Sequence, residues 1–138
     1  MNNSNTPQKL RIALAGLGFG KKIHLEALKE SEYLIPTAIY HYKKEKGPSL
    51  EKDTGLNFYN DWGELVKSKD IDGIIIATSP ESRFKLAKEA LKNNKHLLLE
   101  KPVALTSEEI EELQRISLTN NLSVCVDFEY RAVPLFLQ

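Results

Sequence analysis

A glycine-rich turn is the first feature of this 138-residue sequence that suggests chemistry. A predicted strand from Leu10 to Ala15, apolar from Ile12 onward, leads directly into Gly16-Leu17-Gly18-Phe19-Gly20, and a helical pattern follows. Glycines in such a connection let the backbone turn tightly and approach a pyrophosphate, while the free amides of the helix face the anion. Lys21 adds a positive charge, although the usual fingerprint has Gly or Ala at that position. We therefore predict a phosphate-binding turn; the alternative is a glycine-rich turn that binds nothing.

The segment after the second predicted strand is basic. Dinucleotide-binding folds that prefer NAD usually carry an acidic residue about 20 residues after the glycines, where it binds the ribose 2′-hydroxyl. Here His41, Tyr42, Lys43 and Lys44 precede the first acid, Glu45. His41 and the lysines could neutralise a 2′-phosphate, and Tyr42 could stack on adenine. The pattern favours NADP over NAD, with a solvated basic turn as the alternative.

A carboxylate and an ammonium group stand together at Glu100 and Lys101, after a short apolar run and before Pro102. Ligands of open α/β sheets bind outside the carboxyl ends of the strands, which is where this pair is expected. There the two groups could orient a ribose and polarise a carbonyl or hydroxyl group. A surface ion pair before a proline turn is the alternative interpretation.

Short apolar runs predict the strands that must position these groups. They cover residues 12–15, 74–77, 97–99 and 122–126, with further strands expected at 36–42 and 58–59. Helical patterns lie between them, notably at residues 61–67, 80–94 and 106–120. Strands that alternate with helices imply right-handed crossovers and a parallel sheet covered on both faces. We therefore expect one α/β domain built on a doubly wound parallel sheet.

Two of the expected helices carry signals at their N-termini. Ser79 followed by Pro80 is typical of a helix that starts with a capping residue and a proline in its first turn. Thr106 and Glu109 form a capping box, in which Glu109 is expected to reach back to the amide of Thr106.

The composition excludes several classes of protein. Lys and Arg number 19, as do Asp and Glu, so no broad basic field is present for nucleic acid. No apolar run approaches the roughly 20 residues of a membrane helix. The one cysteine, Cys125, cannot form an internal disulfide and is expected to be a packed strand residue, which fits a reducing, cytoplasmic location. His24, His41 and His96 lack a Cys or carboxylate pattern, so no metal is expected.

Four segments carry a resemblance to a known family. They are the glycine turn with His24 after it, Ala77-Thr78-Ser79-Pro80, the run from Asn94 to Ala104 that contains Glu100-Lys101-Pro102, and Arg131 with Pro134. In order and approximate spacing they resemble the N-terminal nucleotide-binding domain of the glucose-fructose oxidoreductase/inositol dehydrogenase (Gfo/Idh/MocA) family. The chain departs from the family pattern at Phe84, where relatives often have His, and at Asn94, where Gly is usual.

The resemblance implies a Rossmann-type fold with NAD or NADP laid across the strand ends. By analogy, Glu100 approaches the nicotinamide ribose, Lys101 is the active-site lysine, and the Lys101–Pro102 bond is cis. Arg131 corresponds to an arginine near the nicotinamide end. Together with the segments above, this gives the expected cofactor-binding residues: Gly16, Leu17, Gly18, Phe19, Gly20, Lys21, His41, Tyr42, Lys43, Thr78, Ser79, Pro80, Glu100, Lys101 and Arg131.

The family's members continue beyond the equivalent of Pro134 into a second domain that binds the substrate. We therefore expect a disordered tail at residues 1–9, a dinucleotide-binding domain at 10–130 and the start of a linker at 131–138. The implied reaction is hydride transfer between nicotinamide and a sugar, polyol or related substrate, which binds only when the C-terminal domain is present. A non-catalytic nucleotide-binding module that dimerises through its C-terminal edge is one alternative. A second is an S-adenosylmethionine-dependent methyltransferase, against which the basic segment at 41–44 argues.

Overall fold

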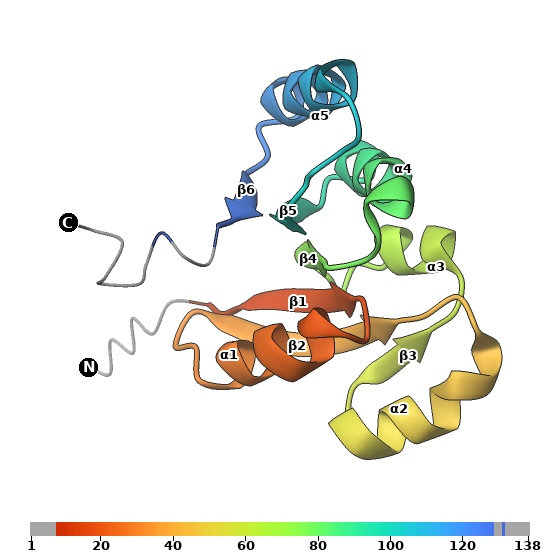
Figure 1. The fold of residues 1–138 in the computed structure, drawn as a ribbon. Coiled ribbons are helices and arrows are strands. Elements are labelled where there is room, and N and C mark those ends of the chain that lie inside the picture. Colours follow the sequence, from red (N-terminus) through yellow and green to blue (C-terminus); the bar gives the residue numbers. More distant parts are fainter. Residues whose placement is uncertain (1–7, 129–130, 132–138) are drawn as a thin grey trace, which may run out of the picture.

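The computed structural model describes residues 8–128 and Arg131. Within these residues, six strands form one parallel sheet in the order β3-β2-β1-β4-β5-β6 (Figure 1). The strands are β1 Leu10–Ala15, β2 Leu34–Tyr40, β3 Asn57–Tyr59, β4 Gly73–Ile76, β5 His96–Glu100 and β6 Val124–Asp127. This is the strand order of the Rossmann fold, which confirms the expected doubly wound sheet.

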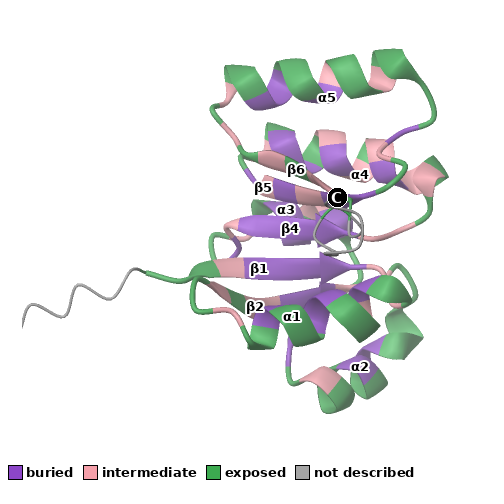
Figure 2. Cartoon of the chain, turned by 60° about the vertical axis from the view of Figure 1, so that its left-hand side comes forward, coloured by how far each residue is buried: buried purple, intermediate pink, exposed green. Residues whose placement is uncertain are grey.

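Helices cover both faces of the sheet (Figure 2). One face carries a short π-helical turn, η1, that continues into α1, together with the 3₁₀ turn η2 and α2; the other face carries α3, α4 and α5. Their bounds are η1 Gly20–His24, α1 Leu25–Lys29, η2 Lys44–Lys46, α2 Gly47–Thr54, α3 Trp62–Lys67, α4 Pro80–Lys92 and α5 Ser107–Thr119. Among the described residues, no helix combines the length and apolarity needed to cross a lipid bilayer.

The core alternates between the two faces with the period of a strand. Ile12 and Leu14 of β1 pack on the side of α1, while Ala13 and Ala15 pack on the side of α3 and α4. Because β1 and β4 are buried on both faces, they appear in the sequence as continuous apolar runs rather than as an alternating pattern. This burial makes the sheet a rigid platform for the loops at its carboxyl end.

The structure differs from the expected elements in two places. The second strand ends at Tyr40 rather than at Tyr42, because its pairing with β1 stops at Ala15, where β1 turns away at Gly16. His41 and Tyr42 therefore belong to a loop. The sequence analysis also missed α2, a polar helix that buries only Gly47 and Leu50 and so presents little apolar periodicity.

The helix ends confirm the positions of the capping residues and correct two of their expected contacts. Ser79 occupies the N-cap position of α4 with Pro80 after it, although its side chain makes no capping bond. At α5, Thr106 Oγ1 accepts a hydrogen bond from the Glu109 amide at 3.3 Å. Glu109 Oε2 accepts from the amide of Leu105 at 2.9 Å, not from that of Thr106 as expected. The carboxylate thus reaches one residue further back than in the usual capping box.

Cys125 is exposed, so the expectation that it is packed was wrong. It lies on β6, which is one of the two edge strands of the described sheet. With Ile12, Ile75 and Leu98 it lines an apolar groove of about 270 Å³. An apolar strand at the edge of a sheet leaves its alternate side chains uncovered when no helix lies over them, and the sequence does not distinguish an edge strand from a central one.

Candidate functional site: a cleft at the carboxyl end of the sheet

The carboxyl ends of β1, β2 and β4 surround a cleft of about 540 Å³. Strand order reverses between β1 and β4, and such a switch point is where α/β sheets bind their ligands. The cleft is lined by Gly16, Leu17, Tyr40, His41, Tyr42, Ala77, Thr78, Ser79, Ser82 and Leu86. Six of these, namely Gly16, Leu17, His41, Tyr42, Thr78 and Ser79, are among the residues expected to bind the cofactor.

The three glycines of the first turn have three different environments. Gly16 has φ +121°, and a Cβ atom there would lie 2.4 Å from the backbone oxygen of Ala77. Gly18 has open space on the side where a Cβ would project. At Gly20 a Cβ would meet the Ala77 Cβ at 3.3 Å, so this glycine lets the helix pack closely against β4. A tight turn, an open approach and a close helix contact are the three roles that the dinucleotide fingerprint requires, so the turn fits a pyrophosphate.

The basic rim of the cleft is partly ordered by its own contacts. The His41 and Tyr42 rings stack at 4.7 Å, and Lys43 Nζ lies 5.8 Å from the centre of the Tyr42 ring. His41 Nδ1 accepts a hydrogen bond from the Lys43 amide, so the neutral imidazole carries its proton on Nε2. Burial, with the nearby Lys46 charge, lowers the pKa of His41. The positive charge of this rim therefore comes mainly from its lysines at neutral pH.

Lys21 has a partner within the chain. Its Nζ lies 3.2 Å from Asp53 Oδ2 on α2, and both side chains are partly exposed. The ammonium group is therefore directed towards α2 as well as standing beside the glycine turn. An exposed ion pair of this kind is weak and exchanges readily for a stronger anion.

The opposite wall of the cleft is the start of α4. Ser82 Oγ donates to Thr78 Oγ1 at 3.0 Å and lies equally close to the backbone oxygen of Ser79, so the three residues form a hydroxyl-lined rim. Pro80 occupies the first turn of α4. Tyr40, Ser82 and Leu86 line the cleft but were missed from the sequence, although the helical spacing of Ser82 and Leu86 could have placed both on the face of α4 that follows Ser79.

The Lys101 turn follows β5 beside this cleft. The Lys101–Pro102 bond is cis, as the resemblance implied, and Lys101 is exposed. Beneath the turn lies Arg83 of α4, which is 3% exposed. Its guanidinium donates to the backbone oxygens of Glu100 at 2.6 Å, of Pro102 and of Thr78. Burial lowers the pKa of Arg83, and the Glu100 carboxylate opposes that effect.

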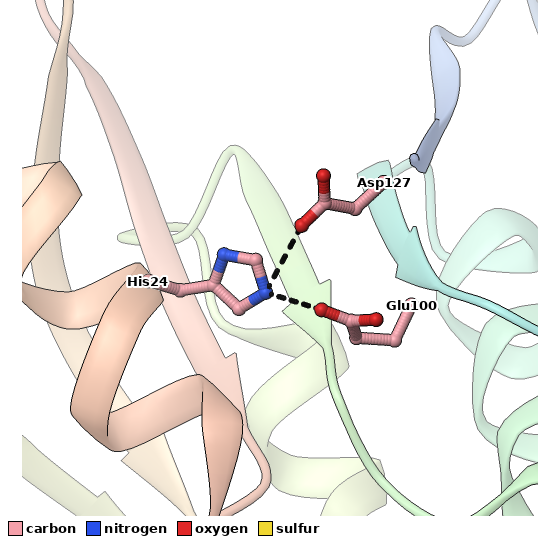
Figure 3. A group of neighbouring side chains, drawn as sticks. All are labelled: His24, Glu100 and Asp127. Atoms are coloured by element: carbon pink, nitrogen blue, oxygen red, sulfur yellow. Dashed lines mark hydrogen bonds and ion pairs between the residues drawn. The ribbon is translucent and has the colours of Figure 1, made fainter. Parts of the chain in front are cut away.

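Glu100 is buried and forms a cluster with two other ionisable groups (Figure 3). His24 Nε2 lies 2.9 Å from Glu100 Oε1 and 3.6 Å from Asp127 Oδ2. The three ligand atoms lie within 4.8 Å of one another, close enough to surround a cation. Contrary to the expectation from the sequence, His24 has two carboxylates beside it, because residues distant in sequence converge on it. A direct hydrogen bond between His24 and Glu100 accounts for the shortest of these contacts. The expectation that no metal binds stays a prediction.

The remaining expected residues are not among those that line the cleft. These are Gly18, Phe19, Gly20, Lys21, Lys43, Pro80, Glu100, Lys101 and Arg131. Arg131 is exposed, and its amide donates to the backbone oxygen of Phe128 at 2.8 Å. Residues 1–7 of the expected tail and 132–138 of the expected linker lie outside the described residues.

Similarity to known proteins identifies the family of this chain. Residues 10–128 match the family model described as "Oxidoreductase family, NAD-binding Rossmann fold" (GFO_IDH_MocA). The chain belongs to this family. An uncharacterised oxidoreductase from Synechocystis is 36% identical over 126 residues, which cover 91% of this chain and 34% of the relative. A myo-inositol 2-dehydrogenase from Thermotoga maritima is 27% identical over 105 residues, covering 75% and 31% of the two chains.

Solved structures agree with the family assignment. The crystal structure of an NAD-binding protein from Listeria innocua superposes with a TM-score of 0.87 at 26% identity, covering 94% of this chain and 38% of that one. The chain thus spans about a third of the length of the curated relatives it matches. Because the family model describes an NAD-binding domain, the cofactor is a nicotinamide dinucleotide.

Proposed function

We propose that this chain is the cofactor-binding part of an oxidoreductase that transfers hydride between NADP and a sugar, polyol or related hydroxyl or carbonyl substrate. The observation that carries the proposal is the cleft at the strand-order switch, with Gly16 at its base and His41 and Tyr42 at its rim. Its lining is mostly apolar with a few hydroxyl groups, a combination typical of nucleotide sites. The Thermotoga maritima relative, an inositol dehydrogenase, supports a polyol substrate.

The residues have distinct roles in this proposal. The glycine turn binds the pyrophosphate, Tyr42 stacks on the adenine, and Thr78 with Ser79 forms the wall beside the nicotinamide half. Lys101 is the proposed catalytic residue: its exposed ammonium positions the substrate oxygen and stabilises charge that develops on it. The nicotinamide supplies the hydride chemistry, and the protein supplies orientation and electrostatics.

The proposed preference for NADP depends on the rim. Among residues 41–44 there is no carboxylate to bind a ribose 2′-hydroxyl, whereas Lys43 and Lys44 can pair with a 2′-phosphate. Because the pKa of His41 is lowered, we assign the positive charge that pairs with the phosphate to the lysines. The role of His41 is to donate a hydrogen bond from Nε2 as a neutral imidazole. Lys43 already lies over the Tyr42 ring and would bind the phosphate beside the stacked adenine.

Fluorescence of Trp62 can measure this preference, since it is the single tryptophan and packs edge-on against Tyr40 of the cleft. We expect NADP to bind about tenfold more tightly than NAD, and Lys43→Ala to remove most of that ratio. Exposed Lys67, at the end of α3, provides the control variant Lys67→Ala, which should leave both affinities unchanged. Tighter binding of NAD by the native chain would refute the preference while leaving the dinucleotide site intact.

In this proposal, catalytic turnover requires a longer protein that also contains the substrate-binding groups. We propose the domain at residues 10–130, the start of a linker at 131–138, and substrate-binding groups in a further domain like those of the longer relatives. The 138-residue chain should therefore bind cofactor yet turn over little substrate. Substantial dehydrogenase activity of the purified chain would contradict this expectation. A cytoplasmic location is also proposed, in keeping with the single cysteine.

A non-catalytic module is the second candidate. The observation that favours it is the apolar groove beside the β6 edge, which a second copy could cover to form a homodimer. Light scattering over a range of concentrations separates the two candidates. A dimer that resists dilution favours the module, and a monomer favours the cofactor-binding part of a larger enzyme.

A further inference from the structure

His24 connects the two turns on which the proposed function depends. It is the last residue of η1, the helical turn that begins at Gly20, and it is 6% exposed. The ring of Phe19, from the glycine turn itself, contacts the imidazole edge-on at 5.3 Å. From this position Nε2 reaches across to Glu100 at the end of β5 and to Asp127 at the end of β6 (Figure 3).

The direction of the hydrogen bond follows from its partners. An ionised carboxylate can only accept hydrogen bonds, so with Glu100 and Asp127 ionised the Nε2 atom of His24 must carry a proton and donate it. The bond at 2.9 Å joins residues 76 positions apart, and both side chains are about nine-tenths buried. A charge-assisted bond in such a site is strong and directional.

Both the side chain and the backbone of Glu100 accept hydrogen bonds. Its carboxylate accepts from His24, and its backbone oxygen accepts from the buried guanidinium of Arg83. Arg83 also binds the oxygens of Pro102 and Thr78, so the residues on either side of Lys101 are fixed to the wall of the cleft. Of these contacts, only the one from His24 comes from the phosphate side of the site.

We propose that His24 is a positioning residue that couples occupancy of the glycine turn to the geometry of the Lys101 turn. The proposal rests on the proposed function, which places a pyrophosphate at the glycine turn and the nicotinamide end beside Lys101. When phosphate binds, η1 is fixed in place, and through Nε2 it fixes Glu100 and the turn that follows. In this proposal His24 acts through Glu100 rather than by contact with the cofactor or the substrate. By linkage, a well-ordered Lys101 turn also strengthens phosphate binding by the same factor.

A cofactor fragment that lacks nicotinamide and the ribose attached to it separates this coupling from direct contact. The probe is adenosine 2′-phosphate 5′-diphosphate, which reaches the glycine turn and the basic rim but has neither the nicotinamide nor the second ribose that would touch Glu100 or the Lys101 turn. Hydrogen exchange at the amides of Lys101, Val103 and Ala104 reports on that turn. In the native chain, saturation with the probe is expected to slow their exchange about fivefold or more.

Variants at His24 then test the mechanism. In His24→Ala we expect the probe still to bind, with the protection at residues 101–104 lost. His24→Gln keeps a donor near the position of Nε2 and should restore most of the protection, a rescue that a purely structural role would not predict. The matched control is His96→Gln, at the amino end of β5, where Nδ1 accepts from the Ser123 amide. It should leave the coupling unchanged.

Stability is measured for every variant, so that unfolding is not mistaken for loss of coupling. If His24→Ala does not fold, Glu100→Gln keeps the side-chain size, removes its charge and is expected to reduce the protection. Protection that survives in His24→Ala, or that is absent in the native chain with the probe bound, overturns the coupling and leaves the proposed function standing. A native chain that binds neither the probe nor NADP overturns both.

Discussion

The two ends of the sheet use their polar groups in opposite ways. At the amino end Arg11 binds Asp72 through Nε at 3.0 Å and Nη2 at 2.9 Å, and Nη2 also donates to the backbone oxygen of Lys69. At the carboxyl end the groups around the cleft are glycine amides, hydroxyl groups and exposed rings. Polar groups at the amino end are paired within the chain and contribute stability, whereas those around the cleft surround the proposed cofactor site.

Each end of the sheet also has a buried cation that binds backbone oxygens. Lys95 is 8% exposed, and its Nζ donates to the backbone oxygens of Ser68 and Ile71, each at 2.6 Å. Arg83 does the same with three oxygens at the other end. Burial lowers the pKa of both groups. A buried cation bound to backbone oxygens therefore closes a loop at the amino end and fixes the Lys101 turn at the carboxyl end, where the proposed function places the reacting groups.

The largest effect is expected from Gly16→Ala, which disrupts the carboxyl end. The new Cβ would lie 2.4 Å from the Ala77 oxygen, in a backbone conformation with φ +121° that an L-residue rarely adopts. We expect a loss of about 3 kcal/mol in the free energy of unfolding, together with loss of cofactor binding. Urea unfolding and a fluorescence titration with NADP measure the two quantities.

Gly18→Ala is the matched control, because a Cβ there has open space. It should change the unfolding free energy by less than about 1 kcal/mol, yet weaken cofactor binding by keeping the phosphate away from the backbone. Equal stability of the two variants would show that the first glycine is not sterically required, and the proposed division of roles would fail.

The sequence predicted the framework well because local patterns determine it. The strand at Leu10–Ala15, the glycine turn after it and the capping residues of α5 depend on nearby residues alone. Strand alternation with helices was sufficient to predict a parallel, doubly wound sheet. The helix α2 was not predicted from the sequence because it is short and polar, and its few apolar residues give no periodic signal.

What could not be predicted depends on contacts between distant segments. The approach of His24 to Glu100 and Asp127 requires the ends of three elements to meet, and only the sheet order brings them together. Arginine in a helix is usually exposed, so nothing in the sequence indicates that Arg83 is buried. Its burial is evident only from the structure, in which the Lys101 turn lies over it. The exposure of Cys125 likewise follows from β6 being at the edge.

A smaller effect, confined to the amino end, is expected from Asp72→Asn. The Arg11 guanidinium and amide lower the pKa of Asp72 to about 2. Because this folded-state pKa lies below the unfolded value near 3.9, the pair stabilises the fold fully above about pH 4 and loses that contribution as pH falls towards 2. The variant should be less stable at pH 7 by about 1–2 kcal/mol, a range reduced for the partial exposure of the pair.

Urea unfolding at several pH values between 2 and 7 measures this effect. The native chain should lose stability below pH 4 more steeply than Asp72→Asn, while the exposed Glu32→Gln control should follow the native curve. Cofactor affinity at pH 7 should be unchanged in both variants, because Asp72 lies at the end of the sheet away from the cleft. Weakened cofactor binding in Asp72→Asn would contradict the separation of the two ends.

The smallest effect is expected at the sheet edge, from Cys125→Ser. If stability resides in the packed core and the paired amino end, an exposed edge side chain should contribute within about 0.5 kcal/mol. The comparison variant Ala13→Ser places a hydroxyl at a fully buried position of β1 and should cost about 1–3 kcal/mol. Thiol labelling of the native chain gives an independent reading, since an exposed Cys125 should react readily. Slow labelling together with a marked loss of stability in Cys125→Ser would show that the Cys125 side chain is covered and that it contributes to the packed core.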